Sequence, residues 1–328
     1  MGFRAAPWTW PLLTVASPIL APVVAVKNIR FRRNQERAER ENRARLERAG
    51  PLDLPELESI ELSVISEQRT KEGFLGEAGV SYLLRTEQGS LLFDVGWGAD
   101  HDVMSRNAAQ LGITLDDADA LVISHLHADH IGGMKAMRAR RVKVVESMGR
   151  PGGQPCYLPD QAEAEGFAPE VVSGPQLLAA GIATTGPLAR SLFFFGWTEE
   201  QVLLARLRGK GLVVITGCGH PTVPVMLKMV SRLSGEPIHA MVGGLHFPVT
   251  GGHGRMLGLD VQTFLGTGKP PWRRITDADL TEAIAAVKEA APARLLLSAH
   301  DTCDHALKRF EEVDADVEVL RAGETYSL

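Results

Sequence analysis

Three histidines and an aspartate directly follow a short apolar run. The run is 120–124, whose length and composition predict a buried strand, and the residues after it include His125, His127, Asp129 and His130. Side chains alternate along an extended chain, so His125 and His127 face one side, while Asp129 and His130 lie in the following turn. Imidazole and carboxylate ligands suit zinc, manganese or iron. The chain must therefore fold so that a buried strand ends at a metal site, with room for a second ion beside the first.

The composition is that of a globular protein. Of the 328 residues, 45% are hydrophobic and 23% are charged, and the three cysteines are widely spaced. These values exclude a disordered, collagen-like or disulfide-stapled chain. The net charge is −5, although residues 27–50 carry nine Lys and Arg against four Glu. Because the main body is therefore acidic, we expect a small-molecule substrate and no nucleic-acid partner. The oligomeric state is left open.

The main domain begins with hairpins and continues with alternating strands and helices. Gly89 supplies a turn between two early strands. This order predicts an α+β fold over residues 58–328. The predicted strands are 60–66, 80–86, 90–95, 142–145, 212–216, 238–242 and 295–298, and the predicted helices are 102–111, 223–233 and 277–290.

An uncharged segment of 22 residues, 5–26, precedes this domain. As a helix it would be about 33 Å long, enough to cross a bilayer, so residues 1–26 are predicted to be a membrane anchor. A cleaved signal peptide with export, or an apolar segment packed on the protein or a partner, is the alternative. Residues 27–57 read as a solvated, charged helical linker. Their positive charge predicts a cytoplasmic catalytic domain.

The sequence resembles the metallo-β-lactamase superfamily in two motifs. One is the complete His-x-His-x-Asp-His pattern ending at His130. The other is Asp94-Val95-Gly96, similar to a strand-ending Asp-x-Gly whose Asp orients metal-binding histidines. The resemblance covers about residues 60–328 and implies an αββα sandwich with a binuclear site at one edge of its sheets. It implies two divalent metals, most often zinc, with manganese or iron as alternatives. Asp129 is then both a ligand and a catalytic residue.

One departure points to a branch of this superfamily. No histidine occurs between residues 131 and 219, and Cys218 stands where many members carry a bridging Asp. Gly217-Cys218-Gly219-His220 and Gly243-Gly244-Leu245-His246 together resemble the dihydropterin-ribofuranosylaminobenzene phosphate synthase-like proteins. The resemblance implies that His220 completes the first metal and His300 the second.

Six further residues receive roles from this resemblance and from their position. Cys218 either bridges the metals as a thiolate or packs under the site as a small buried residue. His246 is expected to contact substrate or to shuttle a proton, and Asp301 to orient a ligand. The Gly- and Pro-rich segment 248–275 is expected to overhang the site. The residues near its end, Trp272, Arg273 and Arg274, are candidates for substrate binding.

The expected activity is hydrolysis by a metal-bound hydroxide, with no protein nucleophile. The branch resemblance favours a phosphoester or a related small anionic ester. A lactone, a β-lactam or another cyclic ester or amide is the alternative within hydrolysis. Outside hydrolysis, an iron redox enzyme and a non-catalytic module with a vestigial metal site remain open.

Overall fold

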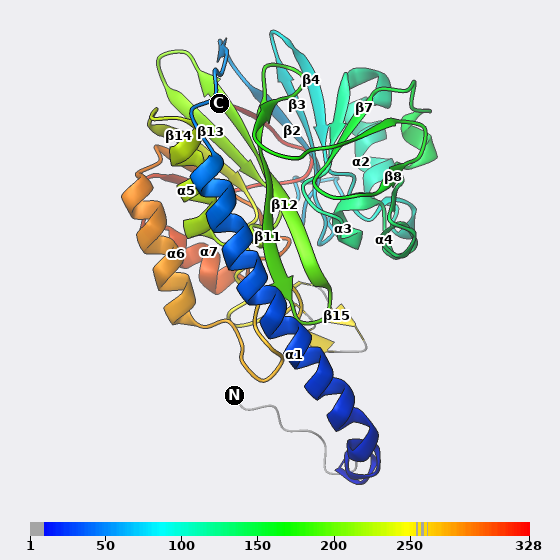
Figure 1. Cartoon of the computed structure of the whole chain (residues 1–328). Helices are drawn as coiled ribbons and strands as arrows, with labels where there is room; N and C mark the ends of the chain where they lie inside the picture. Colours follow the sequence, from blue (N-terminus) through cyan, green and yellow to red (C-terminus); the bar gives the residue numbers. More distant parts are fainter. Residues whose placement is uncertain (1–9, 254, 257–258, 261) are drawn as a thin grey trace.

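A computed structural model describes residues 10–253, 255–256, 259–260 and 262–328. Two mixed sheets pack face to face, and helices cover both outer faces (Figure 1). This is the expected αββα sandwich of α+β class. The helices are α1 (Trp10–Arg48), α2 (Val103–Leu111), α3 (Ala128–Ile131), α4 (Met134–Ala139), α5 (Val223–Leu233), α6 (Asp277–Ala290) and α7 (Asp304–Phe310).

The first sheet is built mainly from the N-terminal half of the domain. It starts with antiparallel hairpins and becomes parallel from β4 onward. In spatial order its strands are β19 (Thr325–Ser327), β2 (Glu61–Ser66), β3 (Ser81–Thr86), β4 (Gly89–Phe93), β5 (Ala120–Val122), β7 (Pro155–Leu158) and β9 (Ala168–Val171).

The second sheet contains a long antiparallel hairpin followed by parallel strands. Its order is β10 (Gln176–Leu177), β11 (Ala183–Leu192), β12 (Gly196–Leu207), β13 (Gly211–Thr216), β14 (Ile238–Gly243), β17 (Arg294–Leu297) and β18 (Asp316–Val319), with β1 (Glu56–Leu57) beside β12. Short pairs join β6 (Arg141–Val142) to β8 (Glu163–Ala164) and β15 (Arg255–Met256) to β16 (Leu259–Asp260).

Three apolar clusters hold these layers together. The central cluster lies between the sheets and includes Tyr82, Phe93 and Val213, all fully buried. The other two join each sheet to its own helices, as Met104 of α2 and Met229 of α5 illustrate. Because both faces of each sheet are covered, inner strands such as β5, β13 and β17 are nearly continuous apolar runs.

Helix α1 packs along β11 and extends beyond the sandwich (Figure 1). Asn42 donates from Nδ2 to the Ala189 carbonyl and accepts from the Ala189 N–H, at 2.9 and 2.7 Å. Arg45 forms an ion pair with Glu199 at 2.9 Å. The helix thereby covers backbone groups at a sheet edge, which would otherwise invite pairing with another chain. This docking differs from the solvated linker expected for residues 27–57, because a few buried residues anchor an otherwise charged helix.

The apolar N-terminal segment is described in part. Residues 5–9 lie outside the described residues, and 10–26 continue into α1. Within the described part of the chain, we find no helix with an apolar stretch sufficient to cross a bilayer. The domain boundaries at residues 26 and 57 and the membrane anchor stay predictions.

Candidate metal centre

The predicted ligands meet where strands of both sheets end. Neighbouring parallel strands have their carboxyl ends at the same edge of a sheet. In the first sheet this brings together the residues that follow β4 and β5, and in the second sheet those that follow β13, β14 and β17. Those residues are Asp94 after β4, His125 to His130 after β5, Cys218 and His220 after β13, His246 after β14 and His300 after β17.

Two groups of candidate ligands lie side by side at this edge. In the first, one nitrogen each of His125, His127 and His220 lie within 4.8 Å of one another. In the second, Asp129, His130, Cys218 and His300 meet the same limit. The structure therefore brings together the residues that the sequence assigned to two metals.

Buried hydrogen bonds orient the first two imidazoles of the core. The Asp94 carboxylate accepts from His130 Nδ1 at 2.6 Å and from the Ser124 hydroxyl at 2.6 Å. Because Ser124 gives its hydrogen to Asp94, its oxygen accepts from His125 Nδ1 at 3.0 Å. Both rings therefore carry hydrogen on Nδ1 and direct Nε2 toward the site. Such outer partners are typical of metal-binding histidines.

A second pair of core residues orients His300 in the same way. The Ser298 hydroxyl donates to Glu67 at 2.5 Å and accepts from His300 Nδ1 at 2.5 Å. Glu67 also accepts from the Tyr82 hydroxyl at 3.1 Å, and burial raises the pKa of this carboxyl to about 7. Sequence reasoning missed Glu67 and Ser298. The signal was present, since each follows a strand as Asp94 follows β4.

The outer side of the site is held by a loop. His220 Nδ1 donates to the Gly266 carbonyl at 3.0 Å, which leaves the Nε2 lone pair facing His127 Nδ1 at 3.1 Å. The Phe195 ring, in the β11–β12 turn, lies 4.5 Å from the His127 ring. The segment 248–275 thus overhangs the metal centre in the region that includes Gly266.

Most of these imidazoles are neutral at neutral pH. Burial lowers the pKa of His127 to about 3 and that of His300 to about 4, and it lowers the pKa of His125 and His220 strongly. Metals bind this deprotonated form. For His130, burial is outweighed by Asp129 and Asp94, whose negative charges raise its pKa to about 9.

The site fits divalent cations on the evidence of unpaired buried atoms. Nε2 of His125 and Nε2 of His127 are buried and have no hydrogen-bond partner among the described residues. An unpaired buried polar atom costs about 1–3 kcal/mol, which a bound cation would offset. Nitrogen, carboxylate and sulfur atoms together form a donor set suited to zinc or a similar metal.

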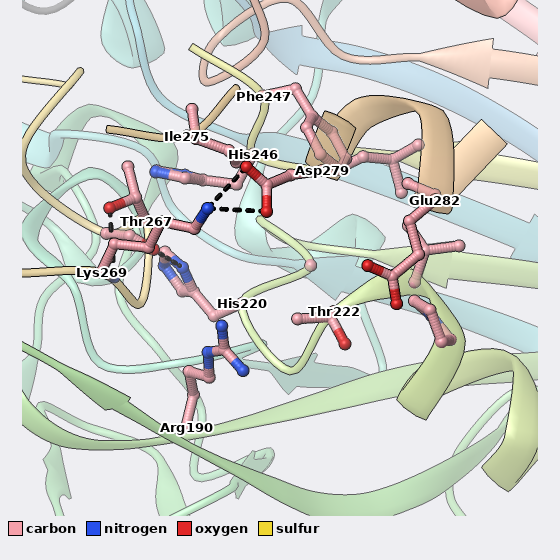
Figure 2. Close-up of a pocket in the computed structure, with 16 residues that line it drawn as sticks. Arg190, His220, Thr222, His246, Phe247, Thr267, Lys269, Ile275, Asp279 and Glu282 are labelled. Carbon is pink, nitrogen blue, oxygen red and sulfur yellow. Dashed lines mark hydrogen bonds and ion pairs between the residues drawn. The ribbon is translucent and has the colours of Figure 1, made fainter. Parts of the chain in front are cut away.

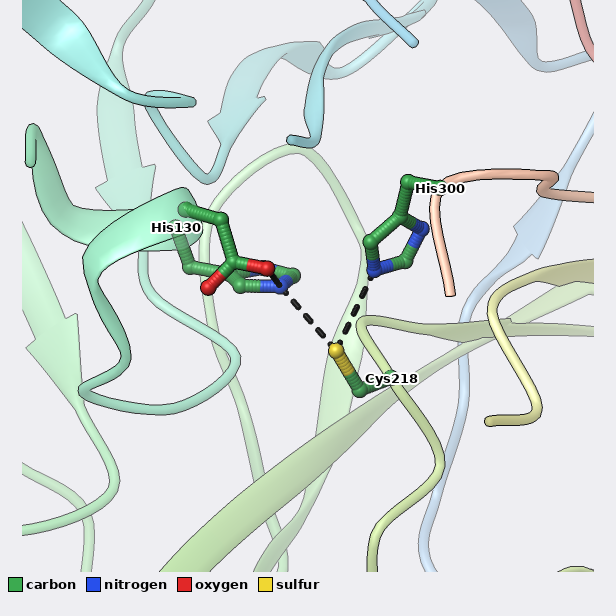
Figure 3. A group of neighbouring side chains, drawn as sticks. His130, Cys218 and His300 are labelled. Atoms are coloured by element: carbon green, nitrogen blue, oxygen red, sulfur yellow. Dashed lines mark hydrogen bonds and ion pairs between the residues drawn. The ribbon is translucent and has the colours of Figure 1, made fainter. Parts of the chain in front are cut away.

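Cys218 lies between the two groups. Its sulfur is 3.1 Å from His130 Nε2 and 3.2 Å from His300 Nε2 (Figure 3), and it also lies near His220 and His246. Burial raises the pKa of the thiol, an effect to which Asp301 adds. A nearby cation would favour the thiolate instead. Both alternatives for Cys218 therefore have a physical basis.

The backbone around Cys218 is fixed by a residue that the sequence did not reveal. Glu200, in the middle of β12, accepts from the N–H groups of Cys218, Gly219 and His220 at 2.8–3.0 Å. Burial raises the pKa of Glu200 to about 7, although these hydrogen bonds favour its charge. Nothing in the strand sequence marks this position, because neighbouring strand residues are polar as well.

His246 lines a cavity of about 260 Å³ beside the metal centre, and Asp301 lies next to His246. His246 Nε2 donates to the Leu265 carbonyl at 3.0 Å, and its Nδ1 is 3.6 Å from Asp301 Oδ2. Burial opposes the charge of Asp301, but His300 and His246 outweigh it and lower the pKa of the carboxyl. His246 also has a backbone φ of 57°, which is unusual for a residue other than glycine.

The three residues proposed for substrate binding lie elsewhere. Trp272, Arg273 and Arg274 are exposed, and none of them lines this cavity. Trp272 packs against Phe193 with ring centroids 5.5 Å apart, and the Arg274 guanidinium lies over Phe264. The cations that line the cavity are Arg190 and Lys269.

Comparison with known proteins identifies the family. A model of the metallo-beta-lactamase superfamily matches residues 75–259, which is more than half of the chain. The chain belongs to the metallo-beta-lactamase superfamily. It is thereby placed among metal-dependent hydrolases, as the sequence resemblance implied, and the two ligand groups lie at the superfamily's expected edge of the sandwich.

Individual relatives of this superfamily member are distant. The chain is 22% identical over 237 residues to a 7,8-dihydropterin-6-methyl-4-(beta-D-ribofuranosyl)-aminobenzene-5'-phosphate synthase of Methanocaldococcus jannaschii, covering 60% of this chain and 80% of the relative. This match agrees with the branch resemblance.

Two solved structures are also similar. Tm1679, described as a metal-dependent hydrolase of the beta-lactamase superfamily, has a TM-score of 0.58 and 20% identity over 81% of this chain and 98% of its own. At 20% identity, this similarity shows a shared fold and no more. The metallo-beta-lactamase fold protein YhfI from Bacillus subtilis has a TM-score of 0.48 and 18% identity over 83% of this chain and 100% of its own.

Proposed function

We propose that this protein is a binuclear metal-dependent hydrolase of a phosphoester or a related small anionic ester. The observation that carries the proposal is the arrangement of His125, His130, His220 and His300. In each of them Nδ1 is engaged by an acceptor of the protein, so that four Nε2 atoms are left to converge on the two ligand groups.

Bound divalent metals would supply Lewis acidity, which lowers the pKa of water and polarises the electrophile. His125, His127 and His220 would hold one ion, and Asp129, His130 and His300 the other. The position of Cys218 between these groups supports its role as a shared ligand. Asp94 and Glu67 fix the ring orientations before a metal arrives, through Ser124 and Ser298.

His246 is the residue we assign to the leaving group. It lines the cavity, and its Nδ1 lies 3.6 Å from Oδ2 of the buried Asp301 carboxylate. The Leu265 carbonyl fixes the ring through Nε2. The loop that contains Leu265 and Gly266 also holds His220, through the Gly266 carbonyl.

Elemental analysis and substrate hydrolysis with the purified full-length protein test this function. We expect two equivalents of zinc or manganese and cleavage of bis(4-nitrophenyl) phosphate. Turnover of only a chromogenic β-lactam or a lactone would replace the phosphoester proposal by the cyclic-substrate alternative. Iron with oxygen consumption would indicate redox chemistry, and protein without metal or turnover would indicate a non-catalytic module.

We also infer that the chain associates with a membrane surface through residues 5–26 and the adjoining apolar patch. Val23, Val24, Val26 and Ile29 of α1 are exposed, as are Phe194 and Trp272 at the same end of the domain. Lys27 Nζ lies 5.0 Å from the centre of the Phe194 ring. Exposed apolar and aromatic side chains beside cations are typical of lipid interfaces.

Vesicle sedimentation tests this association. The full-length protein should sediment with vesicles that contain phosphatidylglycerol, and a variant that lacks residues 1–26 should not. Helix residues 27–48, which dock on β11, stay in that variant. Equal sedimentation of the two proteins, or concentration-dependent dimerisation without vesicle binding, would contradict the membrane assignment.

A further inference from the structure

The cavity beside the metal centre is lined by a positively charged side chain, Arg190, that has no role in the proposed hydrolysis. Arg190 lies on β11, and its half-buried side chain lines the same 260 Å³ cavity as His220 and His246. Figure 2 shows its guanidinium extending from the strand toward His220 and Thr222. The cavity therefore reaches from the metal centre to a positive charge.

The Arg190 guanidinium lacks a direct partner within the described residues. No hydrogen bond or ion pair joins it to any of them. Burial lowers its pKa, and the carboxylates of Glu39 and Asp279 oppose that effect only through space. Gly268 makes room for the group, because a Cβ at that position would lie 2.4 Å from Arg190 Nε. A desolvated guanidinium with five donors and no acceptor is a strong site for an anion.

The start of helix α5 adds a second, independent feature of anion binding. Thr222, Val223 and Pro224 line the cavity, and the 11-residue helix begins at Val223. Thr222 makes no side-chain cap, so its hydroxyl is not engaged by the helix. Pro224 has no N–H, but the other N–H groups of the first turn and the helix dipole at this end favour negative charge.

The two carboxylates that line the cavity, Asp279 and Glu282, form no ion pair with Arg190. Asp279 is bound at 2.6 Å by Lys269 and also accepts from the Thr276 backbone and hydroxyl. Figure 2 shows the Lys269 ammonium bound to both carboxylate oxygens of Asp279. Glu282 is exposed on α6.

From these contacts we propose that Arg190, together with the N-terminus of α5, binds an anionic group of the substrate that is separate from the bond hydrolysed. The group is a phosphate or a carboxylate. The inference rests on the proposed hydrolysis at the metal centre and narrows its substrates to molecules with an additional negative charge. Thr222 donates to the same group, while the scissile bond lies toward His220 and His246.

Calorimetric titration of the zinc-loaded full-length protein with alkylphosphonates tests this subsite. The phosphonate head is constant, and the tail ends in methyl, carboxylate or a second phosphonate after two, three or four methylenes. At the best length, a charged tail should tighten binding by about tenfold or more, as expected for charge-assisted hydrogen bonds. The carboxylate and diphosphonate arms identify which anion is preferred.

Arg190→Gln should remove this advantage and leave the affinity for the methyl-ended compound unchanged. Arg190→Lys, which keeps the charge but loses the planar fork, should keep part of it. Arg273→Gln removes an exposed arginine and is the matched control, with no expected change. Circular dichroism establishes whether each variant is folded. If Arg190→Gln is not folded, the affinities measured with Arg190→Lys decide the test.

Two results would overturn the subsite: no advantage for any charged tail, or an advantage that persists in Arg190→Gln. Cleavage of bis(4-nitrophenyl) phosphate in the same preparations separates this outcome from failure of the proposed function. If the diester is not cleaved but the Arg190-dependent preference is found, the hydrolase proposal fails and the anion subsite stands.

Discussion

The inner and outer histidines of the metal centre are held in different ways. The inner histidines, His125, His130 and His300, are fixed through Nδ1 by serines and carboxylates of the buried core. The outer histidines, His127 and His220, depend on each other, on Phe195 and on the carbonyl of Gly266. The inner supports therefore belong to the folded core, whereas the outer supports lie in a turn and a loop that can vary without unfolding it.

This difference separates stability from metal binding. Variants of the inner supports should lower both the free energy of unfolding and the metal affinity. Variants of the outer histidines should lower metal affinity and activity while changing stability little. We compare free energies of unfolding in metal-free protein, because bound metal would otherwise contribute to every value.

Replacement of Asp94 by Ala should have the largest effect on stability. The change removes the buried partner of His130 Nδ1 and of Ser124, and breaking a buried charged pair costs about 3–5 kcal/mol. Urea unfolding measures the loss, and elemental analysis should show less bound metal. Asp116→Ala, at an exposed aspartate, is the control. An Asp94 variant as stable as that control would contradict the assignment of Asp94 to the inner supports.

Glu67→Gln should produce the next largest effect. The amide keeps the shape but cannot accept fully from Ser298 and Tyr82, and loss of a hydrogen bond to a buried charged group costs about 1.5–3 kcal/mol. Because Ser298 orients His300, metal affinity should fall by about 10–100-fold. Competition with a chromogenic chelator measures this affinity. Glu61→Gln, on the strand β2 that precedes Glu67, is the control, and equal affinities would remove Glu67 from the mechanism.

Gly266→Ala tests the loop that holds His220. Gly266 has a φ of 76°, so alanine should cost about 1 kcal/mol in strain. Its Cβ would also lie 2.5 Å from His246 Cε1 and 3.0 Å from His220 Cε1. Gly209→Ala is a matched control, because its φ is 68° and no atom lies near the new Cβ. The control should lose only the stability that the backbone strain costs, and Gly266→Ala should lose more because of the contact with His246. Only Gly266→Ala should bind metal more weakly; equal metal affinity would argue against support by the loop.

His127→Ala should have the smallest effect on stability and abolish activity. Its buried Nε2 has no hydrogen-bond partner in the described part of the chain, and its Nδ1 makes a single hydrogen bond, to His220 Nε2, so its removal should change the free energy of unfolding by about 1 kcal/mol. Activity and metal content should fall because one of three ligands is lost. His305→Ala, on α7, is the control. Normal turnover by the His127 variant would refute the site assignment.

The local parts of this structure were readable from the sequence. Helices α5 and α6 begin and end as predicted, because each has a clear start signal and an apolar periodicity of its own. The histidine motif was readable for the same reason, since its four ligands lie within six residues. By contrast, β11 and β12 were not predicted. Pro187 and Gly196 interrupt their pattern, and their pairing with each other and with β13 makes them strands.

The sequence by itself determined the family, the sandwich class and the residue types at the metal centre, because these depend on short motifs and periodic runs. Only the tertiary structure decided which groups support and surround that centre. Glu67 and Ser298 come from opposite ends of the domain, and Arg190 on β11 lines one cavity with His220 and Thr222, which follow β13. Such contacts arise from the convergence of strand ends and loops, so no local pattern records them.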